Sequence, residues 1–325
     1  MPRGLWTTTV GSFPKPPELE RARSRHAKGE IGAEELERME REETARCIRM
    51  QEEIGLDILV DGELYRGDMT TYFAERMSGF AISSPVRSYG NRYYRKPVAV
   101  GPIRRTRPLT VDWWRYAQSL TEKPVKGMLT GPYTMMDWAF NEHYPSREAM
   151  AMDLAEAVRE EALALQEAGA TFIQIDEPAI SVRPEELPLA IRAFGRAVQG
   201  LTAKTITHIC YGNFDVIYPA LLDLPVDQID LEMANSRYDL LERFRAQPFT
   251  KEIGFGVLDV HSHRVETKEE IVDGIRRALE VLPPERIYVD PDCGLKTRTV
   301  EESRRKLEVM VAAVREVRAE RGITA

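Results

Sequence analysis

The sequence predicts an α/β protein of the (β/α)8-barrel (TIM-barrel) class, with an insertion after the second strand–helix unit. Two observations lead to this prediction: eight short apolar segments that mostly end in polar residues, glycine or proline, and charged, periodic segments between them. Strands buried on both faces are apolar throughout, and barrel strands become polar where they open into the catalytic face. We expect a single domain over residues 1–325.

The eight predicted strands alternate with helical segments, which favours a parallel barrel. They comprise residues 7–12, 56–63, 125–132, 172–178, 205–212, 228–235, 253–261 and 287–294. The polar ends of these strands are expected at the same end of the barrel, where active sites of this fold lie.

The predicted helices carry start and stop signals. Residues 31–54, 147 to about 168, 268–282 and 301–321 have helical patterns. Gly55 and Gly169 are suited to end the first two, and Ser146 and Thr267 to cap the second and third. Residues 83–124 are too long for a simple crossover, and their segment 89–96 (YGNRYYRK) predicts a hairpin or a loop over the barrel mouth.

The composition excludes several classes of protein. A net charge of -7 argues against general nucleic-acid binding. No apolar run is long enough to span a membrane, and the N-terminus lacks the apolar stretch of a signal peptide. We therefore expect a cytoplasmic protein. Three cysteines cannot form a disulfide framework, so each needs another explanation.

Four residues at predicted strand ends indicate a metal site. His208 and Cys210 share one face of the fifth strand, Glu232 lies near the end of the sixth, and Cys293 ends the eighth. Two thiolates, an imidazole and a carboxylate suit Zn²⁺, and the two sulfurs favour thiol chemistry over hydrolysis. A buried cysteine alone is more often structural, which is our interpretation of Cys47 in a charged helix.

Zinc at such a site would have a definite chemical effect. If a substrate thiol replaced the carboxylate of Glu232, its pKa would fall and a thiolate would be present at neutral pH. A thiolate is a strong nucleophile toward an alkyl group. The donor set therefore predicts alkyl transfer to a thiol.

The chain resembles the catalytic barrel of cobalamin-independent methionine synthase over nearly its whole length. The resemblance is carried by TTTVGSFP, GLDILVDGE, DMTTYF, TGPYTMMDWAF, IQIDEPAI, THICYGNF, LDVHSHRVET and VDPDCGLKTR, in family order. It implies a methyltransferase that makes methionine, with zinc bound by His208, Cys210, Glu232 and Cys293.

The resemblance also implies a homocysteine pocket. The carboxylates of Glu63 and Asp176 would bind the substrate ammonium, and the turn at Gly11 and Ser12 would receive its carboxylate. His261 resembles a histidine that serves as a proton shuttle or substrate contact. Trp138 matches a tryptophan that lies against the pterin in folate-using relatives. Each of these residues could instead have only a structural role in its loop.

The methyl donor remains open at this stage. Full-length members of the family carry a second, N-terminal barrel that helps to hold methylfolate, and this chain matches only the catalytic barrel. We therefore expect a methylated corrinoid as donor, free or bound to a protein, with methyltetrahydrofolate as the alternative. Two other classes compete: alkyl transfer to coenzyme M, which lacks the ammonium that Glu63 and Asp176 would bind, and a zinc-stabilised binding or storage protein.

Overall fold

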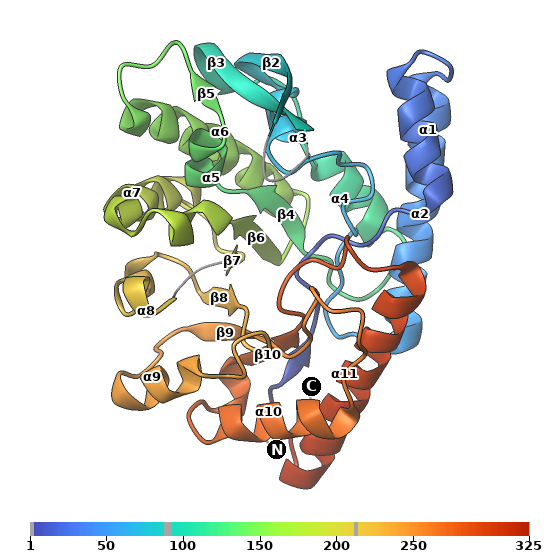
Figure 1. The fold of residues 1–325 in the computed structure, drawn as a ribbon, viewed down its shortest axis with the longest axis vertical. Coiled ribbons are helices and arrows are strands. Elements are labelled where there is room, and N and C mark those ends of the chain that lie inside the picture. The colour runs from blue at the N-terminus through green and yellow to red at the C-terminus, as the bar shows by residue number, and fades with distance from the viewer. Residues whose placement is uncertain (1–2, 88–92, 211–213, 325) are drawn as a thin grey trace. The chain divides into compact units, whose positions relative to one another are not determined.

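The computed structural model describes residues 3–87, 93–210 and 214–324 (Figure 1). The chain forms two compact units. The first contains residues 1–65, 116–126 and 230–325, and the second contains residues 66–115 and 127–229. None of the helices in the described ranges combines the length and apolar character that crossing a membrane requires.

Parallel strands form the centre of each unit. In the first unit, β1 (Trp6–Thr7) pairs with β10 (Ile287–Asp290), which pairs with β9 (Glu252–Gly256). In the second, β4 (Gly127–Thr130) pairs with β6 (Phe172–Asp176), which pairs with β7 (Lys204–Ile209). The boundary between the units falls within β8 (Gln228–Leu231). The prediction of an α/β fold with parallel strands is confirmed.

The predicted second strand, residues 56–63, does not form a regular strand. The backbone N–H groups of Asp57 and Ile58 donate to the carbonyl of Thr7, and Leu59 forms a single parallel bridge with Val125. The chain then turns away, because Gly62 and Glu63 adopt left-handed φ values of 78° and 55°. Within the described ranges, this segment therefore does not supply the regular second strand that a closed eight-stranded barrel requires.

Most predicted strands are longer than the observed ones. The strand predicted at 253–261 ends at Gly256, and the strand predicted at 287–294 ends at Asp290. The polar residues that follow leave the hydrogen-bonding ladder and form loops. His261, Glu232, Cys210 and Cys293 consequently lie in loops just beyond strands.

The predicted helices are present with small shifts at their ends. They correspond to α2 (Ala33–Ile54), α6 (Arg147–Glu167), α10 (Lys268–Leu279) and α11 (Val300–Arg321). Gly55 ends α2 in the left-handed conformation, and Ser146 and Thr267 accept N–H groups of α6 and α10 as predicted caps. Satisfying these terminal N–H groups is what makes Ser and Thr good caps.

Further helices complete each unit (Figure 1). The first unit also contains α1 (Pro17–Ala27), α9 (Leu240–Ala246) and η4 (Pro284–Arg286). The second also contains α3 (Thr71–Ala74), α5 (Pro132–Asp137), η1 (Pro178–Val182), η2 (Pro184–Glu186), α7 (Leu187–Ala197), α8 (Phe214–Ile217) and η3 (Ala220–Asp223). The boundary between the units falls within α4 (Val111–Gln118).

The insertion contains the predicted hairpin, but the hairpin begins earlier than expected. β2 (Met77–Arg87) pairs antiparallel with β3 (Tyr93–Arg105), and β5 (Phe140–Asn141) adds to β3 (Figure 1). Residues 88–92, which include the first part of the YGNRYYRK segment, lie outside the described residues. The buried carboxylate of Glu161 on α6 accepts three successive backbone N–H groups, from Leu109 to Val111, and so anchors the end of the insertion.

Candidate metal and substrate site

Two of the predicted metal ligands lie at the end of β7 in the second unit. His208 and Cys210 are 3% and 5% exposed. The segment that follows β6 holds this backbone, because the Glu177 N–H donates to the His208 carbonyl (3.1 Å) and the Ser181 hydroxyl donates to the Cys210 carbonyl (2.9 Å). The imidazole and the thiol are therefore carried by an anchored backbone.

The other two predicted ligands, Glu232 and Cys293, lie in the first unit. Glu232 follows β8 and is 7% exposed, and Cys293 follows β10 and is partly exposed. His261 lies beside Glu232, with 3.7 Å between its Nε2 atom and Oε1 of the carboxylate. The structure thus brings His261, a predicted proton shuttle, next to the predicted carboxylate ligand.

Asp292, which the sequence analysis did not single out, joins these two segments. Its side chain accepts the backbone N–H groups of Met233 (3.0 Å), Ala234 (2.9 Å) and Asn235 (2.7 Å). Complete burial raises the pKa of Asp292 to about 7 against the opposing effect of these hydrogen bonds. The sequence offered one signal for this role, because Asp292 is an acidic residue directly before Cys293, a predicted ligand.

The loop that carries His261 is held by a buried ion pair. Lys306 on α11 is fully buried, and its Nζ atom contacts the carboxylate of Glu266 (2.8 Å) and the carbonyl of Asp259 (3.0 Å). Glu266 also accepts the Asp259 N–H (3.0 Å), and Asp259 accepts the His261 N–H (2.8 Å). His261 is therefore linked to the core of α11 through three hydrogen bonds.

The predicted substrate residues of the first unit also converge. Phe13 N–H donates to the Gly62 carbonyl (3.0 Å), which joins the Gly11–Ser12 turn to the turn that carries Glu63. Leu295 N–H donates to the Ser12 carbonyl (2.7 Å), two residues after Cys293. The first unit therefore places the predicted carboxylate-binding turn, the ammonium-binding Glu63 and Cys293 on three connected loops.

Asp176 and Trp138 belong to the second unit. Asp176 ends β6, accepts the side-chain amide of Gln174 (2.8 Å) and is 9% exposed. Trp138 ends α5 and is partly buried. Glu177, which directly follows Asp176, is fully buried and accepts the N–H groups of Tyr133 (3.0 Å) and Thr134 (2.7 Å). Burial raises the pKa of Glu177 to about 7 despite these bonds.

Cys47 has no such surroundings, in agreement with its structural interpretation. It is buried in α2, and its Sγ atom accepts the side-chain amide of Gln51 (3.3 Å). Burial raises the pKa of the Cys47 thiol well above its ordinary value, which makes it an inert thiol.

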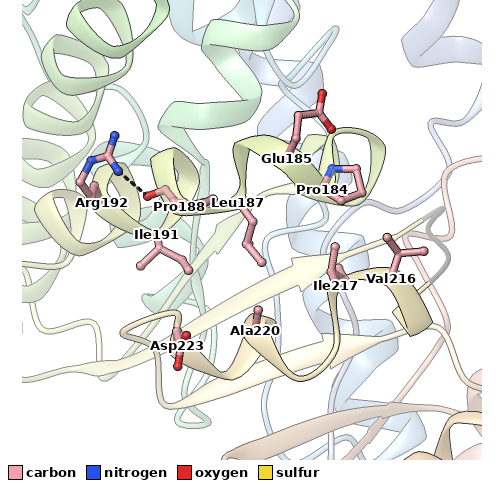
Figure 2. A pocket seen from close by; sticks show the side chains of 10 residues that line it. All are labelled: Pro184, Glu185, Leu187, Pro188, Ile191, Arg192, Val216, Ile217, Ala220 and Asp223. Carbon is pink, nitrogen blue, oxygen red and sulfur yellow. Dashed lines mark hydrogen bonds between the residues drawn. The ribbon is translucent and has the colours of Figure 1, made fainter.

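A surface groove in the second unit is separate from all of these residues. Ten residues of η2, α7, α8 and η3 line it, and Leu187 and Ile191 point toward Ile217 and Ala220 (Figure 2). None of the ten is a predicted ligand or substrate residue. The groove is therefore not the candidate site.

The donor set fits a metal ion. His208, Cys210 and Cys293 could hold one metal ion, and their imidazole and thiol groups are ligand types that Zn²⁺ prefers. A parallel α/β fold that carries such imidazole and thiol donors defines a candidate metal-binding domain.

Comparisons with known proteins identify the family. The sequence profile described as "Cobalamin-independent synthase, Catalytic domain" matches residues 5–316. The 5-methyltetrahydropteroyltriglutamate–homocysteine methyltransferase of Chelativorans sp. (strain BNC1) is 45% identical over 325 residues, which cover 96% of this chain and 42% of that protein. The corresponding enzyme of Nitrobacter winogradskyi is also 45% identical, with 42% of its length covered.

Solved structures agree. A B12-independent methionine synthase from Shewanella sp. W3-18-1, in complex with selenomethionine, has a TM-score of 0.87 at 30% identity and 98% coverage of both chains. A second structure, from Listeria monocytogenes, supports the fold alone, with a TM-score of 0.82 at 22% identity. The chain belongs to the catalytic-domain family of cobalamin-independent synthases. The prediction of a methyltransferase family is confirmed.

These findings correct the expected methyl donor. The family is cobalamin-independent, and its curated relatives are named for methyltetrahydropteroyltriglutamate. The expectation of a methylated corrinoid is therefore wrong. It arose because the chain matches only one barrel of the full-length enzymes, and indeed it spans 42% of the length of these curated relatives.

Proposed function

We propose that this chain transfers a methyl group from a methyltetrahydropteroyl-polyglutamate to the sulfur of homocysteine, with one Zn²⁺ held by His208, Cys210, Glu232 and Cys293. The observation that carries the proposal is the donor set, because His208, Cys210 and Cys293 could hold one metal ion and two of them are thiols. The names of the relatives and the selenomethionine complex of the Shewanella protein support the substrate.

The proposal treats the two units as one catalytic domain over residues 1–325, built as a (β/α)8 barrel. Residues 57–59 support this view, because they hydrogen-bond to Thr7 on one side and to residues 124–126 on the other. They would occupy the position of the second strand of the barrel. The candidate ligands would then lie at the carboxyl ends of the strands, where barrel enzymes carry their active sites.

The substrate groups would be bound by the residues that converge in each unit. Glu63 and Asp176 would bind the ammonium of homocysteine, and backbone N–H groups of the Gly11–Ser12 turn would receive its carboxylate. The left-handed backbone of Glu63 (φ 55°) is consistent with a constrained functional position. Trp138 would lie against the pterin ring of the donor.

The reaction must move one proton. The thiol of homocysteine gives up its proton, and the new S–CH3 bond forms as the N–CH3 bond of the donor breaks. The donor nitrogen must gain a proton, because an amine anion is a poor leaving group. Bound zinc would lower the pKa of the substrate thiol, so that thiolate is present at neutral pH. His261, 3.7 Å from Glu232, is the residue we assign to carrying the proton toward the donor nitrogen.

A product assay tests the proposal. The zinc-loaded chain is incubated with homocysteine and methyl-labelled methyltetrahydropteroyltriglutamate, and labelled methionine is measured, with methylcobalamin as the control donor. We expect methionine from the folate donor only. Methionine from methylcobalamin alone, or turnover without bound metal, would contradict the proposal.

The pocket can be tested separately. Glu63→Gln should raise the homocysteine concentration required for half-maximal rate about 10-fold or more, because one charge-assisted partner of the ammonium is lost. Zinc content should stay unchanged, since Glu63 is not a ligand. Unchanged kinetics would remove Glu63 from the pocket without affecting the metal assignment.

A further inference from the structure

We infer that Asp292 is a positioning residue that fixes Glu232 and Cys293 relative to each other before a metal binds. The inference rests on the proposed function, because it concerns two of the four proposed ligands. Both ligands, and every contact used below, belong to the first unit. Asp292 directly precedes Cys293, and the three residues whose N–H groups it accepts directly follow Glu232.

The contact is a clasp, which we define as the carboxylate of Asp292 with the backbone of Met233, Ala234 and Asn235. Oδ1 accepts two N–H groups at 3.0 and 2.9 Å, and Oδ2 accepts the third at 2.7 Å. Hydrogen bonds from N–H groups to a carboxylate are stronger than hydrogen bonds between neutral groups. The chain after Glu232 is therefore wrapped around the residue that precedes Cys293.

The carboxylate is enclosed as well as bonded. Asp292 is fully buried, and its own N–H donates to the Leu258 carbonyl (3.0 Å). Gly256 leaves the necessary space, because a Cβ atom at this position would lie 2.2 Å from Oδ1 of Asp292. Water cannot readily replace the carboxylate here, so loss of its charge or its second oxygen would leave buried N–H groups without an acceptor.

The clasp restrains the backbone but leaves the side chain of Glu232 its own torsions. The carboxylate of Glu232 can therefore move while its Cα stays at a fixed distance from Cys293. That combination suits a ligand that must hold a metal and yield its position to a substrate thiol. Groups that orient metal ligands in this way typically change metal affinity 10–100-fold when they are mutated.

Cobalt(II) binding tests the inference without relying on turnover. Metal-free protein is titrated with Co²⁺, and the visible absorption bands report affinity and coordination. We expect Asp292→Asn to bind Co²⁺ about 10–100-fold more weakly, with altered bands because one ligand is misplaced. Saturating homocysteine should make the spectra of variant and wild type converge, because the thiol takes the place of the Glu232 carboxylate. If Asp292 only stabilised the fold, homocysteine would not make the two cobalt spectra converge.

Asp57→Asn is the matched control. Asp57 also lies in the first unit and accepts a backbone N–H, from Thr7 at 2.8 Å, together with the guanidinium of Arg318. This variant should lose stability but keep the wild-type affinity for cobalt. If Asp292→Asn keeps the wild-type affinity and spectrum, the inference is overturned. A wild-type protein with no thiolate–cobalt absorption would instead overturn the proposed function.

A second measurement keeps the inference testable if Asp292→Asn does not fold. Hydrogen exchange is followed on metal-free wild-type protein at the amides of Met233, Ala234 and Asn235. We expect exchange at least about 100-fold slower than in an unstructured chain, because these N–H groups are bonded to a buried acceptor. Exchange at the unstructured rate before metal addition would show that the clasp does not precede the metal, and would overturn the inference.

Discussion

The carboxylate of Glu177 occupies the space that a side chain at Gly131 would take. A Cβ atom at Gly131 would lie 2.0 Å from Cδ of Glu177, whose carboxylate is buried and held by hydrogen bonds. Both residues flank the first turn of α5, where Glu177 accepts the N–H groups of Tyr133 and Thr134. The glycine in TGPYT is therefore explained by a close approach, since its φ of -72° is open to any residue.

This contact predicts that Gly131→Ala is strongly destabilising. The added methyl group must displace a buried carboxylate and break at least one of its hydrogen bonds, which together cost about 2–4 kcal/mol. The free energy of unfolding in urea gives the measurement. Gly32→Ala is the control, because Gly32 also precedes a helix with an extended backbone, and a Cβ atom there would lie more than 4 Å from its neighbours in the described ranges. Equal losses in the two variants would refute the steric explanation.

The raised pKa of Glu177 predicts a dependence of stability on pH. Its pKa is about 7 in the folded chain against an ordinary value of 4.5, so the folded state binds more protons between these values. Stability should therefore fall as pH rises from about 4.5 to about 7, by up to about 3 kcal/mol from this group. Glu177→Gln should lack this contribution, so the stability difference between variant and wild type should shift in favour of the variant over this range.

Glu302 gives a control of opposite sign. The Thr299 N–H and His263 lower the pKa of Glu302 to about 2, so its contribution to stability is present above its ordinary pKa and is lost as pH falls toward 2. Glu302→Gln should therefore differ most from wild type near neutral pH and converge with it in acid. A stability difference for Glu177→Gln that is constant from pH 4.5 to about 8 would contradict the assignment of a raised pKa.

Local signals in the sequence were sufficient to predict α2, α6, α10 and α11, but the other helices were not predicted. The caps at Ser146 and Thr267 and the left-handed Gly55 act through neighbours within four residues. The second strand was predicted wrongly: residues 56–63 are apolar enough for a strand, but the left-handed turn at Gly62 and Glu63 leads the chain away after the pairing at Leu59. Several strands were predicted to be too long, because the polar residues that directly follow them were counted as part of the strand.

The buried charged residues could not be placed from the sequence. Asp292 and its N–H donors are 57–59 residues apart, and Lys306 and Glu266 are 40 apart, so no local pattern joins them. In contrast, His208, Cys210 and Cys293 could be proposed as ligands from the sequence, because their residue types are rare and each follows a recognisable strand. Residue chemistry suggests candidate ligands, whereas only the fold reveals the residues that hold their loops.

The buried pair of Lys306 and Glu266 predicts a large, non-additive effect. Lys306→Met leaves the Glu266 carboxylate buried without its cation and should cost about 3–5 kcal/mol. Lys306→Met with Glu266→Gln should cost less than the sum of the two single changes. The exposed pair of Lys268 and Glu316, at 2.6 Å, is the control and should contribute no more than about 1 kcal/mol. Additive losses at Lys306 and Glu266 would show that the two charges are not coupled.

We predict that two of the three cysteines are required for zinc binding and that the third, Cys47, is not. Cys210→Ser and Cys293→Ser should each reduce zinc content from about one ion per chain to a small fraction, because a hydroxyl is a much poorer zinc ligand than a thiolate. Cys47→Ser should keep its zinc, since the Cys47 thiol is buried against Gln51 in α2. Zinc measured by atomic emission after exhaustive dialysis, alongside the unfolding midpoint, separates loss of a ligand from loss of structure. Zinc retained by Cys293→Ser at wild-type stoichiometry would remove the first unit's thiol from the site, and with it the reason to expect that Asp292 acts on the metal.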